Sequence, residues 1–162
     1  MDTSSFFDYS SDSAVTSQEG LILLKDATEQ DWDILLSFTT TQRFSAGDWV
    51  IVAGDEADSL FLIADGELEV LIPVGRNKSL KRLTTIHQGS VIGEQSFFDE
   101  QPRSVTCRAN TDGELYRLNR ANFMVMSAKH PALSRNLLLD LGKIISLRLR
   151  QTTEFLAQGN GK

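Results

Sequence analysis

The residues best suited to chemistry lie between Gly93 and Thr106, where the rhythm of short apolar stretches is interrupted. Gly93 lets backbone amides approach a ligand closely, because it has no Cβ. The planar guanidinium of Arg103 suits phosphate oxygens. Glu94 is unsuited to a phosphate but can accept hydrogen bonds from a sugar hydroxyl. One helical turn from Gln95 to Phe98 would present free N–H groups to an anion. The segment therefore predicts a pocket for a phosphate joined to a ribose.

Other residue types give little support for catalysis. His87 and His130 are the only histidines, too few for the metal site of a β-barrel enzyme. The single cysteine, Cys107, is expected to pack within a strand. No nucleophile–base pair, P-loop or dinucleotide fingerprint occurs. We therefore expect no enzyme activity, no catalytic residue and no metal.

Composition and charge narrow the class of protein. A chain of 162 residues suffices for one domain with a substantial core. The net charge of −6 offers no basic footprint for nucleic acid. No apolar stretch is long enough to span a membrane, and no secretory signal is recognisable. With one cysteine, a reducing compartment is expected, and the cytoplasm is the default.

The elements that must position these residues form a mainly β domain with flanking helices. Between residues 40 and 118, short β-rich stretches alternate with Gly- and Asp-containing turns, which predicts an antiparallel β-roll of the jelly-roll kind. The predicted strands are Trp49–Val52, Leu60–Ile63, Leu68–Ile72, Leu80–Ile86, Val105–Ala109 and Leu115–Leu118. Asp65-Gly66 and Asp112-Gly113 predict tight hairpins, because such turns need a positive φ.

Helices are predicted on both sides of the roll. Thr28, followed by an acid at Asp31, indicates the N-cap of a short helix that ends near residues 37–39. Two helices follow the roll, one over Arg120–Lys129 and a longer one from about Ala132 to Phe155, separated at His130-Pro131. The apolar face of the longer helix is wide enough for both the domain and a partner. That face comprises Leu137, Leu138, Leu141, Ile144, Ile145 and Leu149.

The chain divides into an N-terminal tail at residues 1–20, a domain at 21–157 and a polar tail at 158–162. The N-terminal tail holds four acids (Asp2, Asp8, Asp12 and Glu19) and no Lys or Arg. Its low hydrophobicity predicts a solvated tail. The alternative is a peptide that binds a partner, or docks on the domain itself, through Phe6 and Phe7.

The segment from Gly93 to Thr106 resembles the phosphate-binding cassette of the cyclic nucleotide-binding domain family. The likeness lies in Gly93-Glu94 and in Pro102-Arg103-Ser104-Val105-Thr106. The likeness extends to the framework across about residues 21–150. The framework positions are Gly47-Asp48, Gly54-Asp55, Phe61-Leu62-Ile63 leading to Gly66, and Val70 followed by Leu83 and Gly89.

The resemblance implies a role for each cassette residue. Glu94 is expected to bind the ribose 2′-hydroxyl, and Arg103 the exocyclic phosphate oxygens together with the amides of Ser96 and Ser104. An apolar wall around sugar and purine is expected from Val91, Leu71 and Leu83. Gln95 departs from the family's usual apolar residue. The implied ligand-binding set is Gly93, Glu94, Gln95, Ser96, Arg103, Ser104, Val105, Val91, Leu71 and Leu83.

The expected function is a stand-alone sensor of cAMP or cGMP that signals to a partner protein through movement of its C-terminal helix. That helix also suggests a homodimer. Residues 156–162 leave no room for a helix-turn-helix, so no contact with nucleic acid is expected. Ser104 does not decide between adenine and guanine; the compact, bacterial style of the chain favours cAMP. The alternative is a ligand-free interaction scaffold, in which Arg103 and Glu94 form a buried ion pair.

Overall fold

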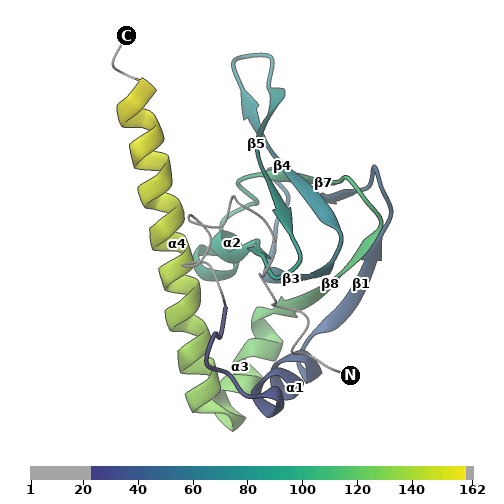
Figure 1. The fold of residues 1–162 in the computed structure, drawn as a ribbon, viewed down its shortest axis with the longest axis vertical. Coiled ribbons are helices and arrows are strands. Elements are labelled where there is room, and N and C mark those ends of the chain that lie inside the picture. Colours follow the sequence, from purple (N-terminus) through teal and green to yellow (C-terminus); the bar gives the residue numbers. More distant parts are fainter. Residues whose placement is uncertain (1–22, 160–162) are drawn as a thin grey trace.

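The computed structural model describes residues 23–159 (Figure 1). The predictions made for residues 1–20 and 160–162 lie outside the described residues. Within them, the chain forms eight strands and four helices. No helix among these residues combines the length and apolarity needed to cross a bilayer.

The β-roll consists of two four-stranded sheets of antiparallel strands, as the sequence predicts. One sheet has the order β1-β8-β3-β6 and the other β2-β7-β4-β5. The strands are β1 (Thr40–Phe44), β2 (Trp49–Ile51), β3 (Ser59–Asp65), β4 (Glu67–Val74), β5 (Ser79–His87), β6 (Val91–Ile92), β7 (Thr106–Ala109) and β8 (Gly113–Asn119). The predicted strand list omitted β1 and β6, because β1 is largely polar and exposed and β6 has two residues.

The prediction of two tight hairpins is wrong. Asp65-Gly66 joins β3 to β4 and Asp112-Gly113 joins β7 to β8, and in each case the two strands belong to different sheets. The two turns lie against each other: a Cβ at Gly66 would come within 2.7 Å of the Asp112 carbonyl oxygen. Glycine is therefore needed at this corner for close backbone approach, with a φ of 90° at Gly66.

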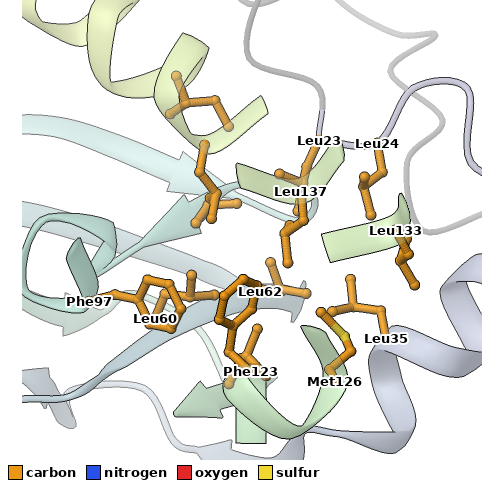
Figure 2. Packing of buried hydrophobic residues seen from close by; sticks show 14 of the residues in the cluster. Leu23, Leu24, Leu35, Leu60, Leu62, Phe97, Phe123, Met126, Leu133 and Leu137 are labelled. Carbon is orange, nitrogen blue, oxygen red and sulfur yellow. The ribbon is translucent and has the colours of Figure 1, made fainter. Parts of the chain in front are cut away.

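β3 is buried on both faces, which explains its continuous apolar sequence. Leu60 and Leu62 face a core cluster shared with the helices, whereas Phe61 and Ile63 face a second cluster inside the roll. Figure 2 shows Leu60 and Leu62 in the first cluster, together with Phe97, Phe123 and residues of the terminal helices. The sheet that holds β3 thus separates the roll interior from the helical core.

The helices are α1 (Glu29–Ser37), α2 (Glu94–Asp99), α3 (Arg120–Lys129) and α4 (Pro131–Gly159). The capping box of α1 is present as predicted: the Asp31 amide donates to Thr28 Oγ1 at 3.1 Å. α4 has 29 residues and is longer than predicted at both ends. It lies along one side of the roll, with α2 between them (Figure 1). A charged side chain on α4 can therefore reach the cassette, residues 93–106.

Candidate functional site

The cassette begins where β6 ends and α2 starts. Gly93 occupies the N-cap position of α2 in the left-handed region, with a φ of 78°. A side chain there would also collide with Arg103 Nη1 and approach the Ser59 carbonyl oxygen to 3.0 Å. Both the backbone conformation and the lack of space therefore require glycine at this position. The helical turn predicted at Gln95–Phe98 is present as α2.

Arg103 is fixed at both its backbone and its side chain. Its amide donates to the Asp55 carbonyl and its own carbonyl accepts from the Gly54 amide, each at 2.8 Å. Its Nη1 donates to the carbonyl oxygens of Ser59 at 2.7 Å and Gly93 at 3.1 Å. The guanidinium is thus tied to the first residue of β3 and to the N-cap of α2.

The guanidinium of Arg103 is half-buried and has no acidic partner among the described residues. Its carbon lies 5.2 Å from the centroid of the Phe61 ring, on the roll side of β3. Burial lowers the pKa of Arg103 below its ordinary value, and the nearby charge of Arg117 lowers it further. Within residues 23–159, no ion pair includes Arg103, and no hydrogen bond is formed by its Nε or Nη2. Its positive charge is therefore not compensated by a salt bridge within the domain.

A polar network supports the carbonyl that holds Arg103. The Ser59 hydroxyl donates to Asp58 Oδ1 at 2.5 Å and accepts from Arg117 Nε at 2.8 Å. The hydrogen bond from Ser59 has the largest effect and lowers the pKa of Asp58; burial opposes it, and the charge and hydrogen bond of Arg117 lower the pKa further. Asp58 is therefore kept ionised, and Ser59 is fixed on β3 from both sides.

Glu94 is buried, with 4% of its surface exposed, and it pairs with a residue of the C-terminal helix. Arg148 Nη1 lies 2.6 Å from Glu94 Oε1, and Arg148 Nη2 donates to the Val91 carbonyl at the same distance. The buried Glu94–Arg103 ion pair considered in the scaffold alternative is not formed among the described residues. Glu94 Oε2 forms no hydrogen bond within residues 23–159.

The remaining cassette residues differ in exposure. Gln95 is exposed, so its departure from an apolar type disturbs no packing. Ser96 is buried, whereas Ser104 is exposed in a bend. Val105 is half-buried and packs against the core of the roll. The chain thus brings Gly93, Glu94, Ser96 and Arg103 together around one end of α2.

The three residues expected to form the apolar wall lie in different environments. Val91 packs in the helical core, on the side of the sheet away from the roll interior, because it pairs with Leu62 and shares its face. Leu83 is 59% exposed on β5, at the bulge where the register with β4 shifts. Leu71 is buried next to the same bulge. Ile92 and Phe61, not Val91, belong to the roll cluster.

The sequence did not assign Arg148 or Ser59 to the site, and it placed Phe61 only in the framework. A signal for Arg148 existed, because it continues the buried stripe of α4. Leu137, Leu141, Ile144 and Arg148 follow one another at spacings of three and four residues, so they share one face of the helix. A cation at the end of a buried stripe needs a carboxylate partner. No comparable signal marked Ser59, whose carbonyl does the binding.

Chemically, the groups gathered at the site are ones that bind a ligand. The site presents the guanidinium of Arg103, which binds the Gly93 carbonyl, and the buried carboxylate of the next residue, Glu94. Within residues 23–159, no group of three or more His, Cys, Asp or Glu side chains is arranged to hold a metal ion. Cys107 is fully buried in the roll core. The geometry suits a ligand that carries both an anion and hydroxyl groups.

Comparison with known proteins identifies the same class of domain. The family model described as the cyclic nucleotide-binding domain matches residues 41–130, more than half of the chain. The chain is 30% identical over 125 residues to the cAMP-activated global transcriptional regulator Vfr of Pseudomonas aeruginosa, covering 75% of this chain and 56% of the regulator. It is 31% identical over 106 residues to the cGMP-dependent protein kinase egl-4 of Caenorhabditis elegans, covering 65% of this chain and 13% of the kinase.

The fold agrees with this. The crystal structure of a cyclic nucleotide-binding domain from Methylobacillus flagellatus is similar with a TM-score of 0.78 at 24% identity, covering 90% of this chain and 82% of that one. The chain spans between 7% and 56% of the length of its first curated relatives.

Proposed function

The chain belongs to the cyclic nucleotide-binding domain family, and from this premise we propose that it is a non-enzymatic sensor of cAMP or cGMP. The regulator Vfr is named as cAMP-activated and the kinase egl-4 as cGMP-dependent, so relatives of both kinds support a cyclic mononucleotide as the ligand class. Neither name distinguishes the base for this chain. Both nucleotides are therefore candidates.

The observation that carries the proposal is the state of Arg103. A half-buried guanidinium without an acidic partner is unfavourable, since charges removed from water need compensation. Two carbonyl oxygens satisfy Nη1 alone, which leaves Nε and Nη2 as donors. A cyclic phosphate supplies a negative charge and oxygens that suit this planar group. Arg103 is thus the proposed phosphate ligand.

Glu94 is the proposed ribose ligand and also the link to α4. Its Oε1 accepts from Arg148, so Oε2 is the oxygen left to accept from a 2′-hydroxyl. A nucleotide bound at Glu94 therefore alters the charge and position of the partner of Arg148. We propose that occupancy is transmitted to α4 through this pair. A ligand can shift α4 only if it binds the two arrangements with different affinities.

The output surface is proposed to be the outward stripe of α4, where a second copy packs. Leu138, Ile145 and Leu149 lie at spacings of seven and four residues, and Leu156 continues the row. Leu149 and Leu156 are 65% and 59% exposed. Spacings of three, four and seven are those of a helix–helix seam. A symmetric dimer would cover this stripe.

Thermal unfolding with and without each nucleotide tests the proposal. A ligand that binds only the folded state at a hundredfold excess over its Kd adds about 2.7 kcal/mol of stability, or about 5–10 °C in Tm for a domain of this size. Arg103→Ala is expected to abolish the shift without unfolding the chain. Arg108→Ala is the matched control. Arg108 lies on β7, is exposed, and has its guanidinium near an aromatic ring, that of Trp49 on β2.

Two outcomes count against nucleotide binding. If neither nucleotide changes the Tm at millimolar concentration, the fold serves as a ligand-free scaffold, with Arg148 as the permanent partner of Glu94. If the Arg103→Ala and Arg108→Ala variants lose the shift equally, the phosphate contact does not lie at Arg103. The larger shift, with cAMP or with cGMP, identifies the preferred base.

A further inference from the structure

The hairpin of β4 and β5 gathers cations in a chain whose net charge is negative. Four basic residues, Arg76, Lys78, Lys81 and Arg82, fall within residues 71–83, which contain no Asp or Glu. The net charge of −6 divides into −4 on residues 1–20, +4 on this hairpin and −6 on the rest of the chain. The hairpin is therefore the densest run of cations in the sequence, with all four within residues 76–82. The stretch from 115 to 153 is also basic, but its seven cations are spread over 39 residues, with one acid, Asp140, among them. We call residues 71–83 the basic hairpin.

The basic hairpin projects from the roll (Figure 1). Every residue from Ser79 to Thr84 is exposed, although successive side chains of a strand point to opposite faces. β5 also ends its sheet, so one of its edges has no neighbouring strand. Among the described residues, none of its four cations takes part in an ion pair. The cations, the free edge and both faces of the outer part of β5 are therefore accessible to a binding partner.

Apolar side chains accompany the cations. Leu80 is 47% exposed and Leu83 is 59% exposed, and Pro73, opposite Leu80 on β4, is exposed as well. One alternative explanation of the cations is that Lys residues on a free edge prevent unwanted strand pairing. Exposed leucines do not serve that purpose, because they favour association. The surface therefore suits an occupant that is both acidic and apolar.

Residues 1–20 have this chemistry. Their four acids match the four cations in number, and Phe6, Phe7 and Tyr9 supply apolar groups. Twenty extended residues reach roughly 66 Å. A domain of this size has a radius of gyration of about 15 Å, so the segment can reach the hairpin from any position on the surface. The covalent link gives the segment an effective concentration of the order of millimolar.

An anionic membrane is less well matched. The rest of the chain carries −6, which the negative potential of such a surface repels. A segment of the same chain can reach the hairpin without bringing the acids of the rest of the chain close to a negatively charged membrane. We propose that the acidic segment, residues 1–20, docks on the basic hairpin of its own chain. This proposal does not depend on nucleotide binding.

A spin label in the acidic segment tests the docking in the full chain. The variant Ser10→Cys carries the label, and Cys107 is fully buried and stays unlabelled. We expect the amide NMR signals of residues 76–83 to lose at least half of their intensity relative to the reduced label. At about 1 M salt, where the Debye length falls to about 3 Å, the intensity should recover.

Charge reversal identifies the contact. Lys78→Glu with Lys81→Glu should restore the hairpin signals, because the reversed charges repel the acidic segment. The fold should be unaffected, since both side chains are exposed. Lys129→Glu with Arg135→Glu is the matched control, since it makes the same charge change at exposed positions of α3 and α4. Signal loss in this control should equal that of the parent.

Several results would overturn the proposal. Broadening that is spread evenly, or centred on another element, places the segment elsewhere. Broadening that disappears on dilution assigns the docked segment to a second copy. Unbroadened hairpin signals, together with sedimentation on phosphatidylserine vesicles that depends on Lys78 and Lys81, identify a membrane as the occupant.

Discussion

Arg148 on α4 and Glu94 on α2 are separated by 54 residues in the sequence, yet their side chains meet at 2.6 Å. The second guanidinium nitrogen of Arg148 binds the Val91 carbonyl on β6. One side chain of the C-terminal helix therefore holds both elements that flank Gly93. Any ligand that changes the position of Glu94 acts directly on α4.

Removing Arg148 should destabilise the domain and weaken nucleotide binding. Arg148→Ala leaves Glu94 buried without its partner, which typically costs about 3–5 kcal/mol. Urea denaturation measures this cost, and titration with nucleotide measures the expected loss of affinity. Arg150→Ala, an exposed arginine two residues further, should change both quantities little.

The double variant Arg148→Ala with Glu94→Gln isolates the pair. Because each single change already removes the interaction, the two losses of stability should be clearly less than additive. Additive losses would show that the two residues act independently. If Arg148→Ala tightened nucleotide binding, Arg148 would compete with the ligand for Glu94 and would not position it.

Gly93→Ala should abolish nucleotide binding through collision with Arg103. The new Cβ must displace Arg103 Nη1, and the positive φ adds about 1–2 kcal/mol of strain. Gly47→Ala is the matched control, because Gly47 has a φ of 92° but no atom within 4 Å of its Cβ position. Both variants should lose stability in urea, but only Gly93→Ala should lose the thermal shift with nucleotide. Retained binding in Gly93→Ala would refute the assigned close approach.

Cys107 should make the stability of the chain depend on pH in the alkaline range. Burial raises the pKa of Cys107 from 9 to about 12, with Glu94 adding to the effect. The unfolded thiol ionises first, so the contribution of Cys107 is complete below about pH 9 and is lost as pH rises toward 12. The slope is at most about 1.4 kcal/mol per pH unit.

The comparison with Cys107→Ala removes the contributions of Lys and Tyr to this slope. The parent should lose stability faster than the variant between pH 9 and 11, measured by urea denaturation. Parallel curves would mean that the folded chain ionises its thiol as readily as the unfolded chain does.

The outward stripe of α4 should control self-association. Leu149→Glu places a charge in the proposed seam and is expected to lower the mass measured by sedimentation from dimer to monomer. Leu139→Glu is the matched control, since Leu139 is equally exposed at 66% but lies about a quarter of a turn away from the stripe. A monomeric parent at micromolar concentration, or equal effects of both variants, would remove the dimer.

Features fixed by neighbouring residues could be predicted from the sequence. The N-cap at Thr28 and the turn of helix after Gly93 depend on residues three or four positions away, and both were predicted correctly. Asp65-Gly66 shows the limit of this reasoning. Its residue types indicate a turn, but whether a turn joins paired strands or carries the chain between sheets depends on strands far away in the sequence.

The sequence alone determined the β-roll with flanking helices and the presence of an acid and an arginine in the segment that begins at Gly93, because residue type and spacing carry this information. Only the tertiary structure decided the partners of those two charges. Glu94 binds Arg148 and Arg103 binds the Ser59 carbonyl, because α4 and β3 pack beside α2. Side chains this far apart in the chain meet only through the angles at which their elements pack, and no local pattern records those angles.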